Sequence, residues 1–150
     1  MMRSVLFVGF KGKNNTSGVL AESLSPQHLL LTNSFAGLKK DIDSACKEYD
    51  CAVMFGVDKT LKDAVRIEKT ATLEGKTIST VLEAKDFKTM LESAGIAATI
   101  SEVPTAYLCN EAYWHMLKKL EGRAVFIHIP TVKYADGGFM EKMRAAFRKI

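Results

Sequence analysis

Apolar and polar positions follow one another along the chain in blocks that predict strands and helices. Short apolar runs are typical of buried strands, and they occur at residues 5–9, 28–32, 51–56, 96–101 and 124–129. Apolar positions three or four apart predict amphipathic helices, which we place at residues 17–24, 37–49, 84–94, 105–120 and 139–150. Helices and buried strands therefore alternate through most of the chain.

One segment has a different period. Apolar and polar side chains alternate over residues 65–72, with Lys69 breaking the pattern, and this predicts one half-buried strand. Glu74 and Gly75 form a turn signal, so residues 76–81 are the expected hairpin partner.

This order of elements predicts an α/β fold, a three-layer α/β/α sandwich with a mostly parallel central sheet. The 150 residues, 47% of them hydrophobic and 25% charged, suit a single domain spanning residues 1–150 with a sizeable core. No linker or internal repeat interrupts the pattern.

Charge, hydrophobicity and cysteine content indicate which partners and which cellular location to expect. The net charge of +4 is mild, and the paired lysines at 39–40 and 118–119 fall on predicted solvated helix faces, which argues against nucleic acid as a partner. No apolar run has the length of a membrane span, and no signal peptide is recognisable. Three cysteines without a C-x-x-C pattern indicate reduced thiols, and hence a cytoplasmic location.

Two side chains in the last third of the chain suggest chemistry. Thr105 is the expected N-cap of the helix at 105–120, which places Cys109 about one turn inside it. Free backbone N–H groups and the helix dipole there favour a thiolate, so Cys109 is expected to be alkylated first near pH 6. His128 ends the strand at 124–129, and ligands in such folds meet the carboxyl ends of strands. Cys109 and His128 therefore form a candidate nucleophile–base pair.

Each candidate also has a structural reading. A cysteine at a helix start is commonly a small buried hydrophobe, and Cys46 and Cys51 are read in that way. A histidine in an apolar strand is commonly a core residue, so His128 alone would be one. Glu68, within its predicted strand, would alone be an exposed carboxylate. Only the three residues together favour catalysis.

Three motifs resemble the pyroglutamyl peptidase I family of cysteine peptidases. The chain has Tyr-Leu-Cys-Asn at 107–110 and Phe-Ile-His-Ile-Pro at 126–130, like the family's nucleophile and histidine segments. Glu-Lys-Thr-Ala at 68–71 fits the family's Glu-x-x-Ala segment, and the chain order of glutamate, cysteine and histidine is the same. The resemblance runs from the first strand to the last helix.

The resemblance implies a Cys-His-Glu triad and a substrate. Cys109 would be the nucleophile, His128 the general base and Glu68 the group that orients it. The family's Gly-Phe after the first strand matches at Phe10, and its Asn-Pro-Ser/Thr fits partly at Asn15, so these two are the expected substrate-binding residues. The implied substrate is a peptide or small acyl amide with an N-terminal pyroglutamyl or similar group. Neither a metal nor an organic cofactor is implied.

The loop after Phe10 departs from the family. The family carries a Pro-Phe-Gly-Gly run there, whose second Phe helps to hold the pyroglutamyl ring, whereas this chain has Lys-Gly-Lys at 11–13. The chain is also shorter between Glu68 and Cys109. Pyroglutamyl amides are therefore expected to be cleaved poorly, or another small acyl group to be preferred.

Two other functions remain open at this stage. The chain could be a catalytically silent relative that binds a peptide or small ligand. It could also be a nucleotide- or phosphate-binding α/β module using residues 9–18, although that loop lacks Gly-Lys-Ser/Thr and Gly-x-Gly-x-x-Gly. The sequence leaves the oligomeric state open, a homo-oligomer included.

Overall fold

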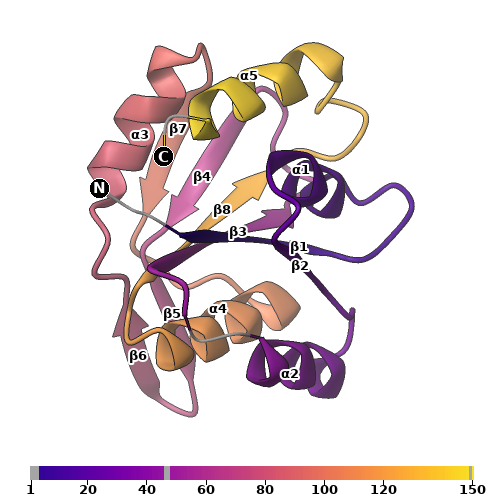
Figure 1. Ribbon diagram of the computed structural model, residues 1–150. Coiled ribbons are helices and arrows are strands. Elements are labelled where there is room, and N and C mark those ends of the chain that lie inside the picture. The colour runs from indigo at the N-terminus through magenta and orange to yellow at the C-terminus, as the bar shows by residue number, and fades with distance from the viewer. Residues whose placement is uncertain (1–3, 46–47, 149) are drawn as a thin grey trace.

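A central sheet of six strands organises the molecule (Figure 1). The computed structural model describes residues 4–45, 48–148 and 150. The spatial order of the sheet is β2-β1-β3-β8-β4-β7, and β5 and β6 form a separate hairpin. The strands are β1 Val5–Phe10, β2 His28–Leu31, β3 Cys51–Val57, β4 Ala64–Glu68, β5 Thr70–Leu73, β6 Lys76–Ser79, β7 Ala97–Ser101 and β8 Ala124–Ile129. The helices are α1 Thr16–Leu24, α2 Phe35–Ser44, α3 Ala84–Ser93, α4 Tyr107–Lys119 and α5 Gly137–Phe147.

Helices cover both faces of the sheet, which confirms the predicted three-layer α/β/α fold (Figure 1). On one face, α1, α3 and α5 pack over a core that includes Phe55, Ile127 and Phe147. On the other, α2, α4 and the β5–β6 hairpin enclose a second core that includes Tyr113 and Phe126. The sheet is thus buried on both sides, as expected for its apolar strands.

The sheet is mostly parallel, as predicted, with one antiparallel junction. β2, β1, β3 and β8 run in the same direction, whereas β4 pairs antiparallel with β8 and parallel with β7. The register places Arg66 opposite His128 and Glu68 opposite Phe126. This junction carries most of the polar side chains that matter below.

The prediction of one strand over residues 65–72 was wrong. The chain forms two strands that separate at Lys69, where the alternation breaks. The Lys69 N–H donates to the Ser101 carbonyl over 2.9 Å, and its carbonyl accepts from the Thr80 N–H over 2.8 Å. Lys69 therefore bonds to the end of β7 in the central sheet and to the residue that follows β6, and β4 joins the central sheet while β5 enters the hairpin with β6.

Several helix limits also differ from those predicted. The helix expected to reach residue 49 ends at Ser44, and the glycine at residue 137 begins α5 instead of preceding it. The N-cap of α4 is Ala106, without a side-chain hydrogen bond, and not Thr105. Tyr107 then begins the helix with a φ of 58°, a left-handed conformation that is uncommon outside glycine.

The connection from β7 to α4 crosses between opposite ends of the sheet. Because β7 runs opposite to β8, its carboxyl end lies at the far edge from the ends of β3 and β8. Residues 102–106 then carry the chain across beneath the sheet to the start of α4 (Figure 1). The start of α4 thereby returns to the edge where β3 and β8 end.

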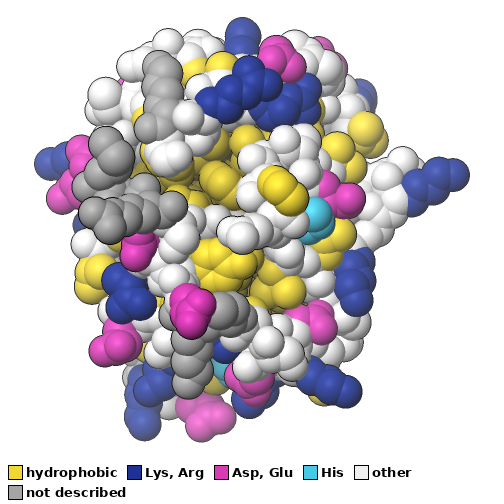
Figure 2. All heavy atoms as spheres, in the orientation of Figure 1, with side chains coloured by type: hydrophobic (Ala, Val, Ile, Leu, Met, Phe, Trp, Pro, Cys, Tyr) yellow, Lys and Arg dark blue, Asp and Glu magenta, His cyan; other side chains and the backbone are white. Residues whose placement is uncertain are grey.

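On the face of the molecule shown in Figure 2, charges of both signs are mixed. Figure 2 shows Lys and Arg side chains interspersed with Asp and Glu around the visible face. Among the helices in the described residues, none combines the length and apolar composition that a bilayer crossing needs.

Candidate functional site

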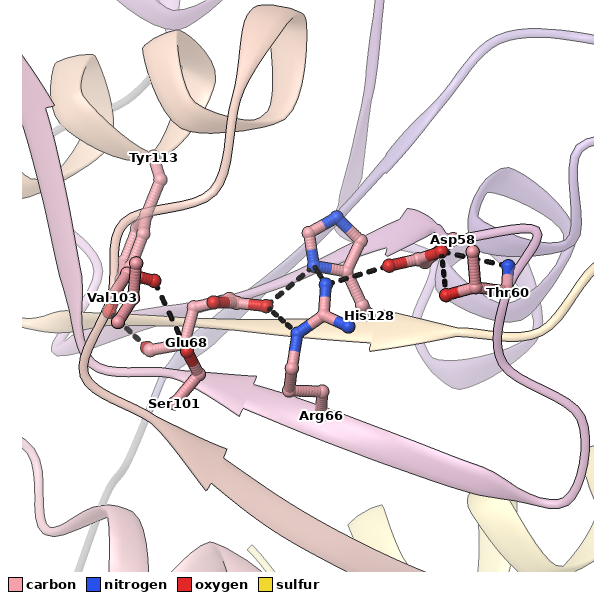
Figure 3. Close-up of polar contacts among 8 residues, drawn as sticks. All are labelled: Asp58, Thr60, Arg66, Glu68, Ser101, Val103, Tyr113 and His128. Atoms are coloured by element: carbon pink, nitrogen blue, oxygen red, sulfur yellow. Dashed lines mark hydrogen bonds and ion pairs between the residues drawn. The ribbon is translucent and has the colours of Figure 1, made fainter.

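A chain of hydrogen-bonded side chains crosses the antiparallel junction (Figure 3). His128 Nδ1 lies 2.8 Å from Glu68 Oε2. Arg66 donates from Nε to Glu68 Oε2 over 2.6 Å, and from Nη2 to Asp58 Oδ2 over 2.8 Å. Asp58 Oδ1 accepts from both the N–H and the hydroxyl of Thr60. Three of these charged groups thus stabilise one another around a single imidazole.

The strand register explains how these side chains meet. Alternate residues of a strand share a face, so Arg66 and Glu68 project to the same side of β4. His128 lies directly opposite Arg66 on β8 and diagonally to Glu68. Diagonal neighbours in an antiparallel pair are within reach of long side chains. Glu68 is 1% exposed and His128 3% exposed, so this pair is screened from water.

The tautomer of His128 follows from this network. An ionised carboxylate can only accept a hydrogen bond, so the proton between His128 and Glu68 belongs to Nδ1. Arg66 Nη2 is 3.3 Å from the same nitrogen, farther than the carboxylate, and its donated bond goes to Asp58. The other ring nitrogen, Nε2, points away from Glu68 and Arg66 in Figure 3. In the neutral ring, Nε2 is therefore the nitrogen without a proton, the one that can accept one.

Cys109 and His128 line one pocket, of about 530 Å³. Its walls come from the end of β3, the start of α4 and β8, and are Val57, Asp58, Lys59, Thr105, Ala106, Tyr107, Leu108, Cys109 and His128. Gly56, paired with His128 in the sheet, leaves the space for the sulfur, because an added Cβ there would lie 2.9 Å from Cys109 Sγ. Cys109 and His128 therefore line the same pocket, and Glu68 contacts His128 from a position inward from the edge of the sheet.

The expectation of a lowered pKa at Cys109 was wrong. Burial raises the pKa of the Cys109 thiol to about 12. The carboxylates of Glu68 and Asp58 act in the same direction, and the opposing effect of Arg66 is smaller. With these effects the resting group is a neutral thiol.

Two side chains of α4, the helix that carries Cys109, form hydrogen bonds to the backbone of neighbouring strands. The Tyr113 hydroxyl donates to the backbone carbonyl of Glu68 over 2.9 Å. The Asn110 side chain accepts from the Thr72 N–H over 3.0 Å and donates to the Thr72 carbonyl over 2.6 Å. These bonds tie the helix to both β4 and β5, so the asparagine of the Tyr-Leu-Cys-Asn motif has a structural role.

The two expected substrate-binding residues have contacts of another kind. Phe10 is 4% exposed and packs in the core beneath α2 and α4, and it is not among the residues lining the Cys109 pocket. Asn15 caps α1, accepting from both the N–H and the hydroxyl of Ser17. Their substrate-binding roles stay predictions.

Three site residues escaped the sequence analysis. Arg66, Asp58 and Gly56 were not among the candidate residues. The available signal was the i, i+2 spacing of Arg66 and Glu68, which puts both charges on one face of a strand. Cys46, read earlier as a structural thiol, lies outside the described residues, and Cys51 is buried at the start of β3.

Nothing in the described part of the chain suggests a bound metal. No three or more His, Cys, Asp and Glu side chains gather there in a way that could hold a metal ion. What the described cluster can do is transfer protons: an unprotonated imidazole nitrogen and a thiol line one pocket, and a buried carboxylate supports the imidazole.

The raised pKa of the Cys109 thiol contradicts the expected rapid alkylation of this cysteine. With a pKa of about 12, Cys109 should react with iodoacetamide at pH 7 roughly ten to a hundred times more slowly than the same cysteine in urea, after allowance for the greater nucleophilicity of a basic thiolate. Cys51, whose burial raises its pKa to about 11, is the internal comparison. Peptide mass spectrometry of timed samples measures both rates. Equal rates for folded and unfolded Cys109 would mean that a thiolate exists at rest.

Comparison with known proteins supports the fold. No protein-family model matches the sequence, and no curated protein matches it. Pyroglutamyl peptidase I from Bacillus amyloliquefaciens has a similar structure, with a TM-score of 0.82 and 16% identity over 96% of this chain and 95% of that one. Pyrrolidone carboxyl peptidase from Thermococcus litoralis aligns with a TM-score of 0.78 and 19% identity over 98% and 92%. Pyrrolidone carboxyl peptidase from Thermus thermophilus has a TM-score of 0.77 and 17% identity, over 97% of this chain and 100% of that one.

These matches cover nearly the whole length of both chains in each comparison. The resemblance predicted from the motifs is therefore confirmed at the level of the fold. At such low identity a shared fold does not itself establish a shared activity, so the activity has to be argued from the site.

Proposed function

We propose that this chain is a cysteine peptidase or amidase that releases an N-terminal pyroglutamyl or similar small acyl group. The observation that carries the proposal is the 2.8 Å contact between His128 Nδ1 and the buried Glu68 carboxylate, with His128 and Cys109 lining one pocket. A supported imidazole beside a thiol is the arrangement that nucleophilic acyl transfer needs. The similarity to solved pyroglutamyl peptidases adds to it.

The reaction starts from a neutral pair. His128 Nε2 takes the proton of the Cys109 thiol as the sulfur attacks the amide carbonyl, because a thiol with a pKa of about 12 does not ionise on its own near neutral pH. Glu68 accepts the Nδ1–H bond throughout and stabilises the imidazolium that forms. His128 then protonates the leaving amine. Water, deprotonated by His128, releases the acyl group and restores the thiol.

The first turn of α4 supplies the oxyanion site. The N-terminal N–H groups of a helix have no intrahelical partners, and no side chain caps α4. The N–H groups of Leu108 and Cys109 in this turn are the donors that would stabilise the negative oxygen of the tetrahedral intermediate. The left-handed Tyr107 precedes them and is 84% exposed at the pocket.

A panel of fluorogenic acyl amides tests the proposal. Pyroglutamyl, prolyl, alanyl and acetyl amides would be compared for kcat/KM, with Cys109→Ala as the blank. We expect Cys109-dependent hydrolysis, with pyroglutamate a poor or second-ranked acyl group because of the Lys-Gly-Lys loop at 11–13. Selective and efficient pyroglutamyl release would contradict that ranking, and no turnover of any amide would contradict the peptidase.

One observation favours a second candidate function. The raised pKa of Cys109 would also suit a catalytically silent relative that uses the pocket to bind a peptide or small ligand. Such a protein would be stabilised against heat by an acyl amide without hydrolysing it. The phosphate-binding alternative gains no comparable support, because the Ser17 hydroxyl in that loop donates to Asn15 Oδ1 and accepts from the Phe10 N–H.

A further inference from the structure

Arg66 occupies an unusual position beside the proposed general base. Its guanidinium contacts the Glu68 carboxylate, the Asp58 carboxylate and the Nδ1 side of His128, at 2.6, 2.8 and 3.3 Å. The Arg66 side chain is only 26% exposed, so its charge is partly shielded from water. A cation in this place opposes a second positive charge on the imidazole.

We propose that Arg66 is a positioning residue that keeps His128 in its neutral, Nδ1-protonated form, by neutralising Glu68 and opposing protonation of the ring. The inference rests on the proposed function for its catalytic meaning. The arginine does not reach into the pocket and acts only through Glu68 and His128. Its effect is to leave Nε2 able to accept the thiol proton at lower pH than a bare glutamate–histidine pair would allow.

The other charges around His128 set the sign of the effect. Glu68 from β4 and Asp58 from the β3–β4 connection both favour the imidazolium. Lys59 lines the same pocket and favours the neutral ring, and Cys109 on α4 is a neutral thiol. Without Arg66, the Glu68 carboxylate beside the ring and the Asp58 carboxylate in the same pocket would have little compensating positive charge.

Asp58 holds the Arg66 guanidinium in place. Burial acts against ionisation of Asp58, but hydrogen bonds from Thr60 and Arg66 outweigh it and hold the pKa of Asp58 at about 2. The carboxylate thus stays charged throughout the working pH range and anchors the outer edge of the guanidinium. Lysine could replace the charge of Arg66, but it could not span both carboxylates in the same planar geometry.

Titration of the histidine ring by NMR tests this without any need for activity. In Arg66→Gln, the midpoint of His128 should rise by about one pH unit or more, as expected for the loss of a charge within about 4–6 Å. Arg66→Lys should keep the midpoint near that of the parent chain. Asp58→Asn should lower the His128 midpoint. Because this change has the opposite sign, it also tests the proposal if Arg66→Gln does not fold.

A matched control is available on α5. Arg144 on α5 is 25% exposed, close to the 26% of Arg66, and pairs with the exposed Glu141, so Arg144→Gln removes the same charge from a different part of the molecule. It should leave the His128 midpoint unchanged. His28 and His115 provide internal references in every spectrum.

The two hypotheses can fail separately. An unchanged or lower His128 midpoint in Arg66→Gln would overturn the role of Arg66, whatever the chain hydrolyses. A raised midpoint in a chain that cleaves no amide would support Arg66 and contradict the peptidase. If hydrolysis is found, the acid limb of kcat/KM should move to higher pH by the same amount.

Discussion

Cys109→Ala is expected to remove amide hydrolysis by this chain almost completely, by about 10⁴-fold or more in kcat. The sulfur is the only atom in the proposed mechanism that forms the acyl bond, so the alanine variant retains only binding and the oxyanion site. His128→Ala should cost about as much, because the thiol stays protonated without a base. The double variant should be no worse than either single one, since residues of a catalytic unit are not additive.

Glu68→Gln should have a smaller but still large effect. The amide removes the buried charge that stabilises the imidazolium, and its NH₂ group can hold the ring in the other tautomer, with Nε2 protonated. A loss of about 10³- to 10⁴-fold in kcat is the expected scale for such a change. The measurement is kcat/KM against the best amide of the panel.

Cys51→Ala is the control for these variants. Cys51 is a second buried thiol in the same sheet, paired with Val5 at the opposite end of β3 from Gly56. Its replacement should change the free energy of unfolding and leave the hydrolysis rate per folded molecule unchanged. Full activity in Cys109→Ala, or equal loss in both cysteine variants, would mean that Cys109 is not the nucleophile.

Local patterns in the sequence predicted the layers but not the sheet membership of every strand. The apolar run at 124–129 corresponds to β8, and the helix at 84–94 to α3 with one residue fewer. The alternation at 65–72 was correctly periodic, but a period of two does not say which sheet a strand joins. Lys69, read as a flaw in one strand, is the point where the chain leaves one sheet for the other.

The environment of each side chain depended on pairing that a local pattern cannot reveal. Arg66 alternates with apolar neighbours, a pattern that does not reveal its partner, whereas the β4–β8 register places it opposite His128. The helix start at Cys109 favours a thiolate locally. Burial and two carboxylates from distant segments raise its pKa instead. The motifs named Glu68, Cys109 and His128 as candidates, whereas long-range packing determined the charges around them.

Gly56→Ala is the second change with a large expected effect, because the site depends on the absence of a side chain there. An added methyl group would lie 2.6 Å from Phe126 Cζ and 2.9 Å from Cys109 Sγ, closer than real contacts allow. Phe126 is fully buried, with its ring centroid 5.6 Å from that of Tyr113 and 4.9 Å from that of His128, so it has little freedom to move. The sulfur is therefore the atom expected to shift.

The consequences differ in size for stability and for catalysis. Overpacking of this kind costs about 1–3 kcal/mol in the free energy of unfolding. A displacement of the reacting atom by about 1 Å costs about 10²-fold in rate. Urea denaturation measures the first quantity, and kcat/KM well below the unfolding transition measures the second.

Gly137→Ala is the matched control, because the added methyl group there meets nothing within 4 Å. It should leave activity unchanged and be neutral or slightly stabilising, since alanine restricts the unfolded chain. The double variant Gly56→Ala/Phe126→Leu separates the two contacts, because leucine yields space on the ring side only. Recovery of stability without recovery of activity would locate the catalytic loss at the sulfur. Parent-level activity in Gly56→Ala, together with its lowered stability, would instead show that the ring yields and that the Cys109 sulfur does not depend on the gap at Gly56.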